Sequence, residues 1–441
     1  MTDASVPAST PHRSTTVAIV GAGISGLIAA RELSRSGVDV LVVEAAGRVG
    51  GRTMAVTTSL GSTVDLGGQW IGHGHHRFEA LAAEVGASTY AMHTPKRPAI
   101  LDGDKEVGQA SSTSLVANAV LVAWEIAAKV GAPSRWRDKS VQQWISKVPG
   151  AGARRLLEVL VSVSTCAELD ELSMHAFASF IKYQGGLTTM MATSGGAQDS
   201  LVVQGAGHLA RAVAAELGDR VLLDTAVTAI DRNDSGVRLQ TSSGEIRAAK
   251  VVVTVPPPMA RRIVHRPELP AQRAELERTM YMGSVYKAIA VYHTPFWRDV
   301  ADAEAVTLAG TGAAVFDTTP PGGPGHLCIL VAGPQARALD DLTEEQRRTA
   351  LLEPLAKRLG ADICKPVDWY EKSWHTDEFA GGGYSALPLM GHDDGYYPIS
   401  AQPVGHVHWA GTETASEHAG YIEGAIESGE RVAREVAGAL A

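Results

Sequence analysis

Apolar and polar positions change period twice within the first fifty residues, which marks a strand, a helix and a second strand. Residues 17–20 form an apolar run with the length and β-branched character of a buried strand. From residue 27 to residue 33 the apolar positions recur at helical spacing, and Gly37 can end that helix. Residues 38–43 predict the second strand, which ends at Glu44.

Three glycines join the first strand to the helix with the spacing G-x-G-x-x-G, at Gly21, Gly23 and Gly26. Gly21 permits a tight turn, Gly23 lets a pyrophosphate approach the backbone, and Gly26 allows close packing of the helix on the strand. The N–H groups at the positive end of the helix can then hold phosphates. Glu44 lies 18 residues beyond Gly26, where an acid takes ribose hydroxyls and disfavours a 2′-phosphate. The unit therefore predicts a bound dinucleotide.

The rest of the chain leaves this nucleotide-binding pattern and returns to it twice. Residues 91–201 are helical and alanine-rich in pattern. Strands are predicted at residues 221–227, 237–241, 251–255, 288–292 and 407–410, and helices at residues 344–359 and 421–440. We therefore expect a second lobe that lies over the ligand.

Composition restricts the class of protein. The chain has 441 residues, more than a single core usually holds, so two lobes are expected. Its 45% hydrophobic and 20% charged residues are ordinary for a soluble enzyme. The net charge of -9 and a pI near 5.9 argue against nucleic acid or an anionic membrane as partner. Cys166, Cys328 and Cys364 are too far apart for a disulfide framework, which favours a reducing, cytoplasmic setting.

Two segments need a separate interpretation. Residues 1–14 are small, polar and proline-containing, so we expect a disordered tail and no signal peptide. The longest apolar stretch, residues 115–130, is interrupted by Asn118, Glu125 and Lys129 and predicts an amphipathic helix of a soluble protein, with no membrane span.

Five strings carry a family resemblance: VAIVGAGISGL, GRVGGRT, DLGGQWIG, MGSVYKAIAVY and HWAGTETASEHAGYIEGAIESGERVARE. With them the chain resembles the FAD-dependent flavin amine oxidase family, in its monoamine oxidase-like branch, over about residues 15–437. The resemblance implies an α/β fold with a Rossmann-like FAD-binding domain, discontinuous in sequence, and an α+β substrate-binding domain with a helical cap. The expected boundaries are 1–89, 202–276 and 377–441 for the first domain and 90–201 and 277–376 for the second.

The resemblance also implies which residues bind FAD. The expected set is Gly21, Gly23, Ser25, Gly26, Glu44, Arg52, Gly67, Gly68, Gln69, Trp70, Val227, Trp374, Gly411, Glu413, Tyr421 and Ile422. Among these, Tyr421 and Ile422 would open a helix whose positive end points at the flavin pyrimidine ring, where reduced flavin carries negative charge.

Three residues are implied in the chemistry. Tyr384 and Tyr421 match the two aromatic residues that guide the amine to the flavin face, and electron-rich rings suit an amino group. Lys287 matches the lysine that assists reoxidation of the flavin by oxygen, and a charge within an apolar strand needs such a task. Gly383 stands where the monoamine oxidases carry the cysteine bonded to flavin, so the FAD is expected to be non-covalent.

Specificity is less well determined by the sequence. The segment that lines the cavity in relatives predicts an apolar, adaptable pocket. Its expected residues are Phe177, Phe180, Tyr183, Met190, Met191 and Gln198. The cluster His73, His75 and His76 is interpreted as hydrogen-bonding imidazoles, and no metal is expected.

The expected function is oxidation of an apolar primary amine to an imine, then to aldehyde or ketone with ammonia, with O2 reduced to H2O2. Secondary or cyclic amines and an oxidase-cyclase reaction remain open, and a desaturase, a dehydrogenase or a non-catalytic flavoprotein are more distant alternatives. The expected partners are the small-molecule amine and O2, and a homodimer is one candidate assembly.

Overall fold

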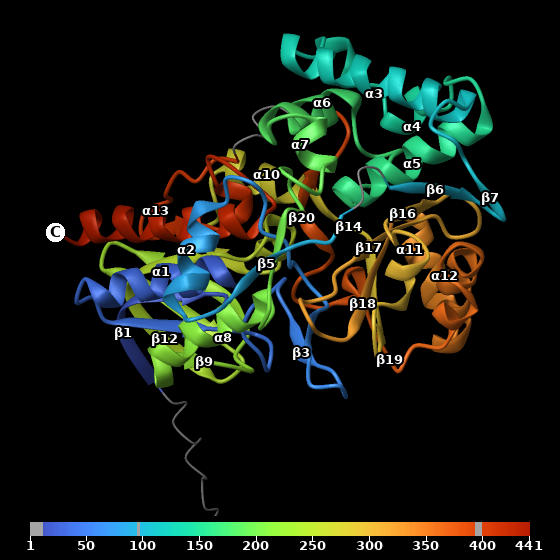
Figure 1. Ribbon diagram of the computed structural model, residues 1–441. Helices are drawn as coiled ribbons and strands as arrows, with labels where there is room; N and C mark the ends of the chain where they lie inside the picture. Colours follow the sequence, from blue (N-terminus) through green and yellow to red (C-terminus); the bar gives the residue numbers. More distant parts are fainter. Residues whose placement is uncertain (1–11, 95–97, 393–398) are drawn as a thin grey trace, which may run out of the picture.

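The computed structural model describes residues 12–94, 98–392 and 399–441, and its larger sheet is built from three separate parts of the chain (Figure 1). The strand order is β13-β10-β11-β12-β1-β2-β9, with β21 also paired to β12. The strands are β1 (His12–Val20), β2 (Val40–Val43), β9 (Val221–Leu222), β10 (Val227–Asn233), β11 (Gly236–Thr241), β12 (Gly244–Val253), β13 (Val264–Arg266) and β21 (Val407–Trp409). Parallel pairing of β1 with β2 and with β12 places the predicted nucleotide-binding strand in the middle of this sheet.

Helices cover the sheet because its central strands are apolar on both faces. Residues 17–20 of β1 are almost completely buried. The helices of this part are α1 (Ile24–Arg35), α2 (His76–Glu84), α8 (Ala206–Leu217), α9 (Pro257–Ala260), α10 (Ala271–Arg278) and α13 (Ile422–Leu440). Helices α1 and α13 pack closely: a Cβ placed on Gly429 would lie 2.5 Å from the Ser25 carbonyl oxygen.

The structure corrects two expectations in this region. The predicted disordered tail reaches too far, because residues 12–14 already belong to β1 and pair with β12, while residues 1–11 lie outside the described residues. The predicted strand at residues 221–227 is two strands, β9 and β10, because the chain turns between them at Asp224, whose φ is +52°.

The second sheet has the order β19-β15-β18-β17-β16-β6-β7. Its strands are β6 (Ala99–Asp102), β7 (Lys105–Glu106), β15 (Val285–Tyr292), β16 (Ala305–Thr307), β17 (Ala313–Asp317), β18 (Gly325–Ala332) and β19 (Asp368–Ser373). Every residue of β15 is buried, and its two faces differ. Tyr286, Ala288 and Ala290 pack in one core with the helices α11 (Pro334–Ala338) and α12 (Glu344–Leu359), and Lys287 lies on the opposite face.

Short ladders connect the remaining strands. They are β3 (Ala55–Thr57) with β4 (Thr63–Asp65), β5 (Thr89–Ala91) with β8 (Ser200–Val202), and β14 (Met280–Gly283) with β20 (Gly383–Pro388). The division of the chain between the sheets is visible in Figure 1, but the domain boundaries themselves stay a prediction.

A group of helices lies above the second sheet (Figure 1). These are α3 (Ser112–Val130), α4 (Val141–Ile145), α5 (Ala151–Thr165), α6 (Met174–Tyr183) and α7 (Leu187–Met191), and α5 contacts β16, β17 and β18. Helix α3 is long and apolar enough, by length and composition, to cross a membrane, with a mean hydropathy of 1.4 and 22% of that window buried. Its outer face carries Leu115, Val122 and Ile126, so the expected amphipathic pattern is wrong for that face.

Candidate functional site

A cavity of about 1250 Å³ extends from the larger sheet to the second sheet. The β1–α1 turn and the end of β2 line one part of it, and β15 to β18 line another. Predicted cofactor residues in its wall are Gly21, Gly23, Ser25, Glu44, Arg52, Gly67, Gly68, Gln69, Trp70, Val227, Trp374, Gly411, Tyr421 and Ile422. A volume above the usual range for one small ligand suits a dinucleotide together with a substrate.

The glycines of the β1–α1 turn have different roles. Gly26 lies behind the cavity wall, where a Cβ would lie 2.0 Å from the Gly21 carbonyl oxygen. Gly21 has a φ of +105°, which favours glycine. A Cβ on Gly23 would meet nothing within 4 Å, and Gly23 is the N-cap of α1. The turn thus leaves open space at the positive end of a helix, which suits a pyrophosphate.

Glu44 lies at the end of β2 and faces the same cavity. Its two carboxylate oxygens accept hydrogen bonds from Ala22 N at 2.7 Å and from Ala46 N at 2.9 Å. Burial raises the pKa of this carboxyl, and these N–H groups oppose the rise. Because each oxygen keeps a further lone pair, the held carboxylate can still accept from ribose hydroxyls.

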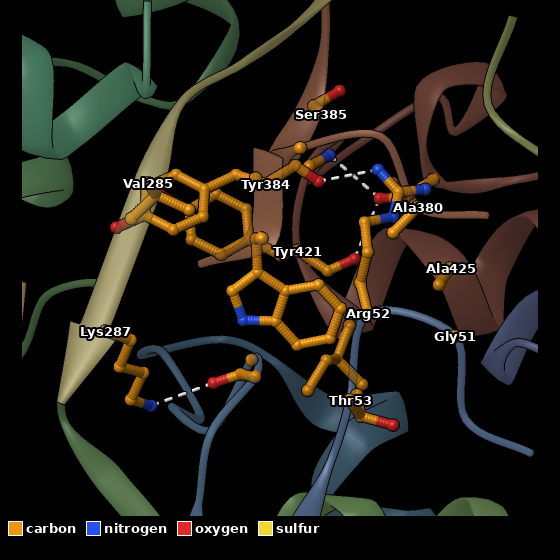
Figure 2. Close-up of a pocket in the computed structure, with 18 of the residues that line it drawn as sticks. Gly51, Arg52, Thr53, Val285, Lys287, Ala380, Tyr384, Ser385, Tyr421 and Ala425 are labelled. Carbon is orange, nitrogen blue, oxygen red and sulfur yellow. Dashed lines mark hydrogen bonds between the residues drawn. The ribbon is translucent and has the colours of Figure 1, made fainter. Parts of the chain in front are cut away.

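Arg52 connects three segments beneath the site. Its guanidinium donates to the Tyr384 carbonyl at 2.7 Å (Figure 2). It also donates to Glu413 Oε1 at 2.6 Å. Glu413 is 2% exposed; burial would raise its pKa, but the Arg52 charge brings the pKa below its usual value. Glu413 therefore fixes the position of Arg52, and it is not among the residues that line the cavity, so its predicted contact with the cofactor stays a prediction.

Lys287 projects from β15 into the cavity (Figure 2). Its side chain is buried, and its Nζ donates to the Gly67 carbonyl at 2.8 Å and to Gln69 Oε1 at 2.5 Å. Burial lowers the pKa of this ammonium. Asp65 lies near enough to oppose that shift, and burial raises the pKa of Asp65 to about 6.

Tyr384 and Tyr421 come from β20 and from the N-cap of α13, and both line the cavity. Figure 2 shows the two side chains at the same end of it, next to Val285. Burial raises the pKa of both phenols, so both are neutral at physiological pH. Tyr384 has a φ of +43°, an uncommon conformation for a residue with a side chain and one that gathers at functional sites.

Two residues that the sequence did not assign support these tyrosines. The Cys166 thiol is hydrogen-bonded to Tyr384, and Cys166 also has a positive φ, of +61°. His75 packs edge-on against Tyr421, with ring centroids 5.1 Å apart, and burial lowers its pKa to about 3. A neutral imidazole that accepts from Gly72 N at 2.9 Å is therefore part of the support of Tyr421. Among the described residues no group of three or more His, Cys, Asp or Glu is arranged to hold a metal.

Both predicted tryptophans are fixed in the wall. Trp374 is 3% exposed and donates from Nε1 to the Leu66 carbonyl at 2.7 Å. Trp70 packs against Phe316, with ring centroids 5.1 Å apart. The two indole rings thus lie near the glycine pair Gly67–Gly68 and near Lys287, where a planar ligand can stack on them.

Four of the six predicted substrate residues line the cavity: Phe180, Met190, Met191 and Gln198. The other two do not. Phe177 points into the core of the helical group and packs against Trp124, and the Tyr183 hydroxyl donates to the Ala415 carbonyl. Helical periodicity places both on α6, but it does not decide which side of that helix meets the cavity.

FAD fits these residues. The turn at Gly23 has room for a pyrophosphate, and Glu44 can take ribose hydroxyls. Gln69 and Lys287 place polar side chains in the wall of the same cavity. Fold and site together define a flavoprotein oxidoreductase.

Comparison with known families identifies which flavoprotein oxidoreductases this chain belongs to. The model of the flavin containing amine oxidoreductases matches residues 24–437, so the chain belongs to this family. It is 35% identical to a putative flavin-containing monoamine oxidase, AofH, of Mycobacterium tuberculosis, over 96% of this chain and 97% of that one. The protein is therefore an FAD-containing oxidoreductase that acts on amines.

Two solved structures have the same fold. The cyclohexylamine oxidase from Brevibacterium oxydans superposes with a TM-score of 0.91 at 29% identity, covering 97% of this chain and 99% of that one. A putrescine oxidase bound to putrescine superposes with a TM-score of 0.87 at 27% identity, covering 97% and 100%. The α/β fold predicted from the sequence is thereby confirmed.

Proposed function

We propose that the protein oxidises primary amines that carry an apolar body, with non-covalently bound FAD and with O2 as electron acceptor. The products are an imine, which water converts to aldehyde or ketone and ammonia, and H2O2. The observation that supports this most directly is the meeting of Tyr384, Tyr421 and Lys287 in one cavity that also contains the glycine turn.

When bound, FAD supplies the hydride acceptor for the carbon that carries the amino nitrogen. The protein has to present a neutral amine, because an ammonium has no lone pair to assist that transfer. Tyr384 and Tyr421 are neutral phenols, so they offer electron-rich faces to the amine without a counter-charge that would hold it protonated. Their proposed task is to orient the amine and to exclude water.

Lys287 is the proposed residue for the reaction with oxygen. Its ammonium is buried and is held by two oxygen acceptors, Gly67 O and Gln69 Oε1, so its position is fixed before any ligand arrives. A fixed buried cation stabilises negative charge that develops beside it more strongly than a solvated one would.

The non-covalent attachment is supported by the space around Gly383. A Cβ at this position would lie 2.2 Å from Val285 Cγ1 and 3.0 Å from Cys166 Sγ, so a cysteine cannot occupy it without movement of β15. We expect acid or heat denaturation to release free FAD, and flavin that stays on the polypeptide would contradict the proposal.

The preference for an apolar body is supported by the walls beyond the tyrosines. Phe180, Met190 and Met191 line the cavity there, and methionine adapts to ligands of different shape. Gln198 is the polar exception, but its Nε2 already donates to the Met190 carbonyl at 3.1 Å. Cyclohexylamine and putrescine, after which the two superposed oxidases are named, are both primary amines.

The experiment is a screen of the purified protein with primary, secondary and cyclic amines, read by H2O2 release and by bleaching of the flavin absorbance without oxygen. Primary amines should give the highest kcat/KM. A higher kcat/KM for secondary or cyclic amines would move the assignment to that class, and bleaching without peroxide would indicate a dehydrogenase.

A further inference from the structure

A buried carboxyl lies two residues before the segment that holds Lys287. Asp65 is the last residue of β4, and Gly67 and Gln69 follow it along the chain. Lys287 Nζ donates to the Gly67 carbonyl at 2.8 Å and to Gln69 Oε1 at 2.5 Å. Asp65 is 7% exposed and Lys287 is 3% exposed, so both ionisable groups are removed from water. The proposed function uses the lysine but assigns the carboxyl no role.

The Asp65 carboxylate is fixed by the first turn of α8. Its Oδ2 accepts a hydrogen bond from Ala206 N at 2.8 Å, and its Oδ1 accepts one from Gly207 N at 3.1 Å. A carboxylate is favourable at this end of a helix because the first N–H groups have no partner within the helix. The chain continues from this joint between β4 and α8 directly to Gly67 and Gln69. The two oxygens that hold Lys287 therefore depend on how Asp65 is anchored.

The other groups next to Lys287 carry no charge at neutral pH. Cys328 on β18 is buried, and burial raises the pKa of its thiol, which therefore keeps its proton. The Trp70 ring, whose centroid lies 5.4 Å from Lys287 Nζ, is neutral. Gln69 contributes only the dipole of its amide. Among the described residues, Asp65 is thus the one carboxylate whose charge acts on the lysine.

Burial and the Asp65 charge act on Lys287 in opposite directions. Burial lowers the pKa of the ammonium, and Asp65 raises it. Burial also raises the pKa of Asp65 to about 6, so its carboxyl is ionised at neutral and alkaline pH. Of its other ionisable neighbours, Arg211 on α8 favours the ionised form, and Tyr90 is neutral because burial raises the pKa of its phenol.

Loss of the Asp65 charge would leave Lys287 as an isolated buried cation. The two side chains form no direct ion pair, but charges interact more strongly in a buried region than in water. A buried ammonium without a nearby anion releases its proton more readily, because only the charged form is penalised by burial. The charge of the lysine therefore depends on a residue that does not touch it.

We propose that Asp65 is a positioning residue for the reaction with O2: its carboxylate keeps Lys287 charged, and its attachment to α8 keeps the acceptors of Nζ in place. This inference rests on the role proposed for Lys287. Reoxidation passes two electrons to O2, which takes up two protons, one from the reduced flavin and one from solvent, to form H2O2. Lys287 keeps its own proton and stabilises the negative charge that develops on oxygen, which it can do only as an ammonium.

The test measures reoxidation of the FAD-loaded protein as a function of pH. The flavin is reduced with dithionite under anaerobic conditions and mixed with O2 in a stopped-flow instrument, so the result does not depend on which amine is the substrate. In Asp65→Asn the pH at which the rate constant falls should be lower by about one unit or more than in the unmodified protein. At about pH 6 the two rate constants should agree within about threefold, because Lys287 is charged in both proteins.

Two results would overturn the proposal. One is the same pH dependence in Asp65→Asn and in the unmodified protein. The other is a loss of rate that is equal at every pH, because it would mean that Asp65 only anchors the segment and does not act on the charge of Lys287.

Further variants separate charge from folding. Asp65→Ser also lacks the charge but keeps an acceptor for helix N–H groups, so it should show the same shift if Asp65→Asn folds poorly. Asp65→Glu should return the pH dependence to within about half a unit of the unmodified protein. Glu277→Gln removes a buried carboxyl that pairs with Arg273 and does not line the cavity, and Glu345→Gln removes an exposed one on the first turn of α12. Neither should move the pH dependence.

Unfolding in urea gives a second readout that involves no turnover. Asp65→Asn, Lys287→Met and the double variant form a thermodynamic cycle when the FAD-loaded proteins are compared at neutral pH. Asp65→Asn should destabilise the protein that has Lys287 more than it destabilises the Lys287→Met protein, because only the first is left with an uncompensated buried charge. Equal destabilisation would show that the two side chains do not interact and would contradict the proposal.

Failure of the inference can be distinguished from failure of the proposed function. If Lys287→Met slows reoxidation but Asp65→Asn keeps the pH dependence of the unmodified protein, the role of Asp65 is wrong and the proposed function stands. If no amine reduces the flavin, the proposed function fails, while the dithionite-reduced protein still tests Asp65. If Lys287→Met does not slow reoxidation, the roles of both residues are wrong.

Discussion

The two ends of the cavity recognise their ligands by different means. At the FAD end the wall is mainly backbone, with the open turn at Gly23 and the N–H groups of α1. At the other end the wall is made of side chains from neighbouring strands of the second sheet, among them Lys287, Leu330, Ala314 and Val306, with Glu304 next to them. Backbone recognition needs consecutive residues, whereas side-chain recognition can combine residues from distant parts of the chain. The FAD end can therefore be recognised in the sequence as a motif of consecutive residues, and the substrate end cannot.

The largest effect should come from closing the turn at the FAD end. In Gly26→Val the new side chain would collide with the Gly21 carbonyl, 2.0 Å from the Cβ position, so strand β1 and helix α1 cannot pack. We expect loss of bound flavin and of cooperative folding, measured by the flavin-to-protein absorbance ratio and by thermal unfolding. Gly438→Ala is the control, since its Cβ meets nothing within 4 Å. A yellow, stable Gly26→Val protein would show that the turn is not what holds FAD.

The second effect concerns the far end and its dependence on pH. The pKa of Glu304 is raised to about 7 in the folded protein from 4.5, so the folded state holds its proton more tightly. The stability this provides is present below the unfolded pKa and is lost as pH rises through the folded value. Glu304→Gln should therefore gain stability relative to the unmodified protein between about pH 5 and about pH 8, by about 2–3 kcal/mol.

Urea unfolding of the FAD-loaded proteins at both pH values measures this difference, with Glu345→Gln as the exposed control. A constant difference between Glu304→Gln and the unmodified protein at the two pH values would mean that the carboxyl is already ionised and paired.

A third effect lies between the two ends, at Lys287. Replacement by methionine keeps the length and removes the cation, so reoxidation by O2 should slow by about a hundredfold, the size of effect seen when one fixed electrostatic donor is lost. Anaerobic reduction by amine should change much less. Stopped-flow measurement of the two half-reactions tests this, and Lys129→Met on the exposed part of α3 is the control. Equal slowing of both halves would contradict the role in reoxidation.

The smallest effect tests whether the pyrophosphate of FAD occupies the space next to Gly23. A Cβ at Gly23 meets no protein atom, so Gly23→Ala should leave the unfolding of the FAD-free protein unchanged within about 0.5 kcal/mol. The same methyl group enters the space for the pyrophosphate, and FAD affinity should fall by about tenfold, measured by flavin fluorescence on titration. Unchanged affinity would place the pyrophosphate elsewhere.

Several site residues could be found from the sequence because each lies in a short, distinctive string. The strings around Lys287 and Tyr421 placed two residues in the cavity that Tyr384 also lines. Phe177 and Tyr183 do not line this cavity, since their string gives a helix and not the orientation of that helix. Glu304 lies next to a short apolar strand, but acids near a strand end, such as Asp302 two residues before it, are common at the surface.

The sequence by itself determined the strand–turn–helix unit, the glycine cradle and the acid at the end of β2, because these depend on neighbours within a few tens of residues. Only the tertiary structure decided that Lys287, Leu330, Ala314 and Val306 lie side by side on one face of the second sheet, and that Glu413 pairs with Arg52. The reason is that strand order and register join segments that no local pattern connects. The role of a buried charged side chain depends on the groups that this pairing brings next to it.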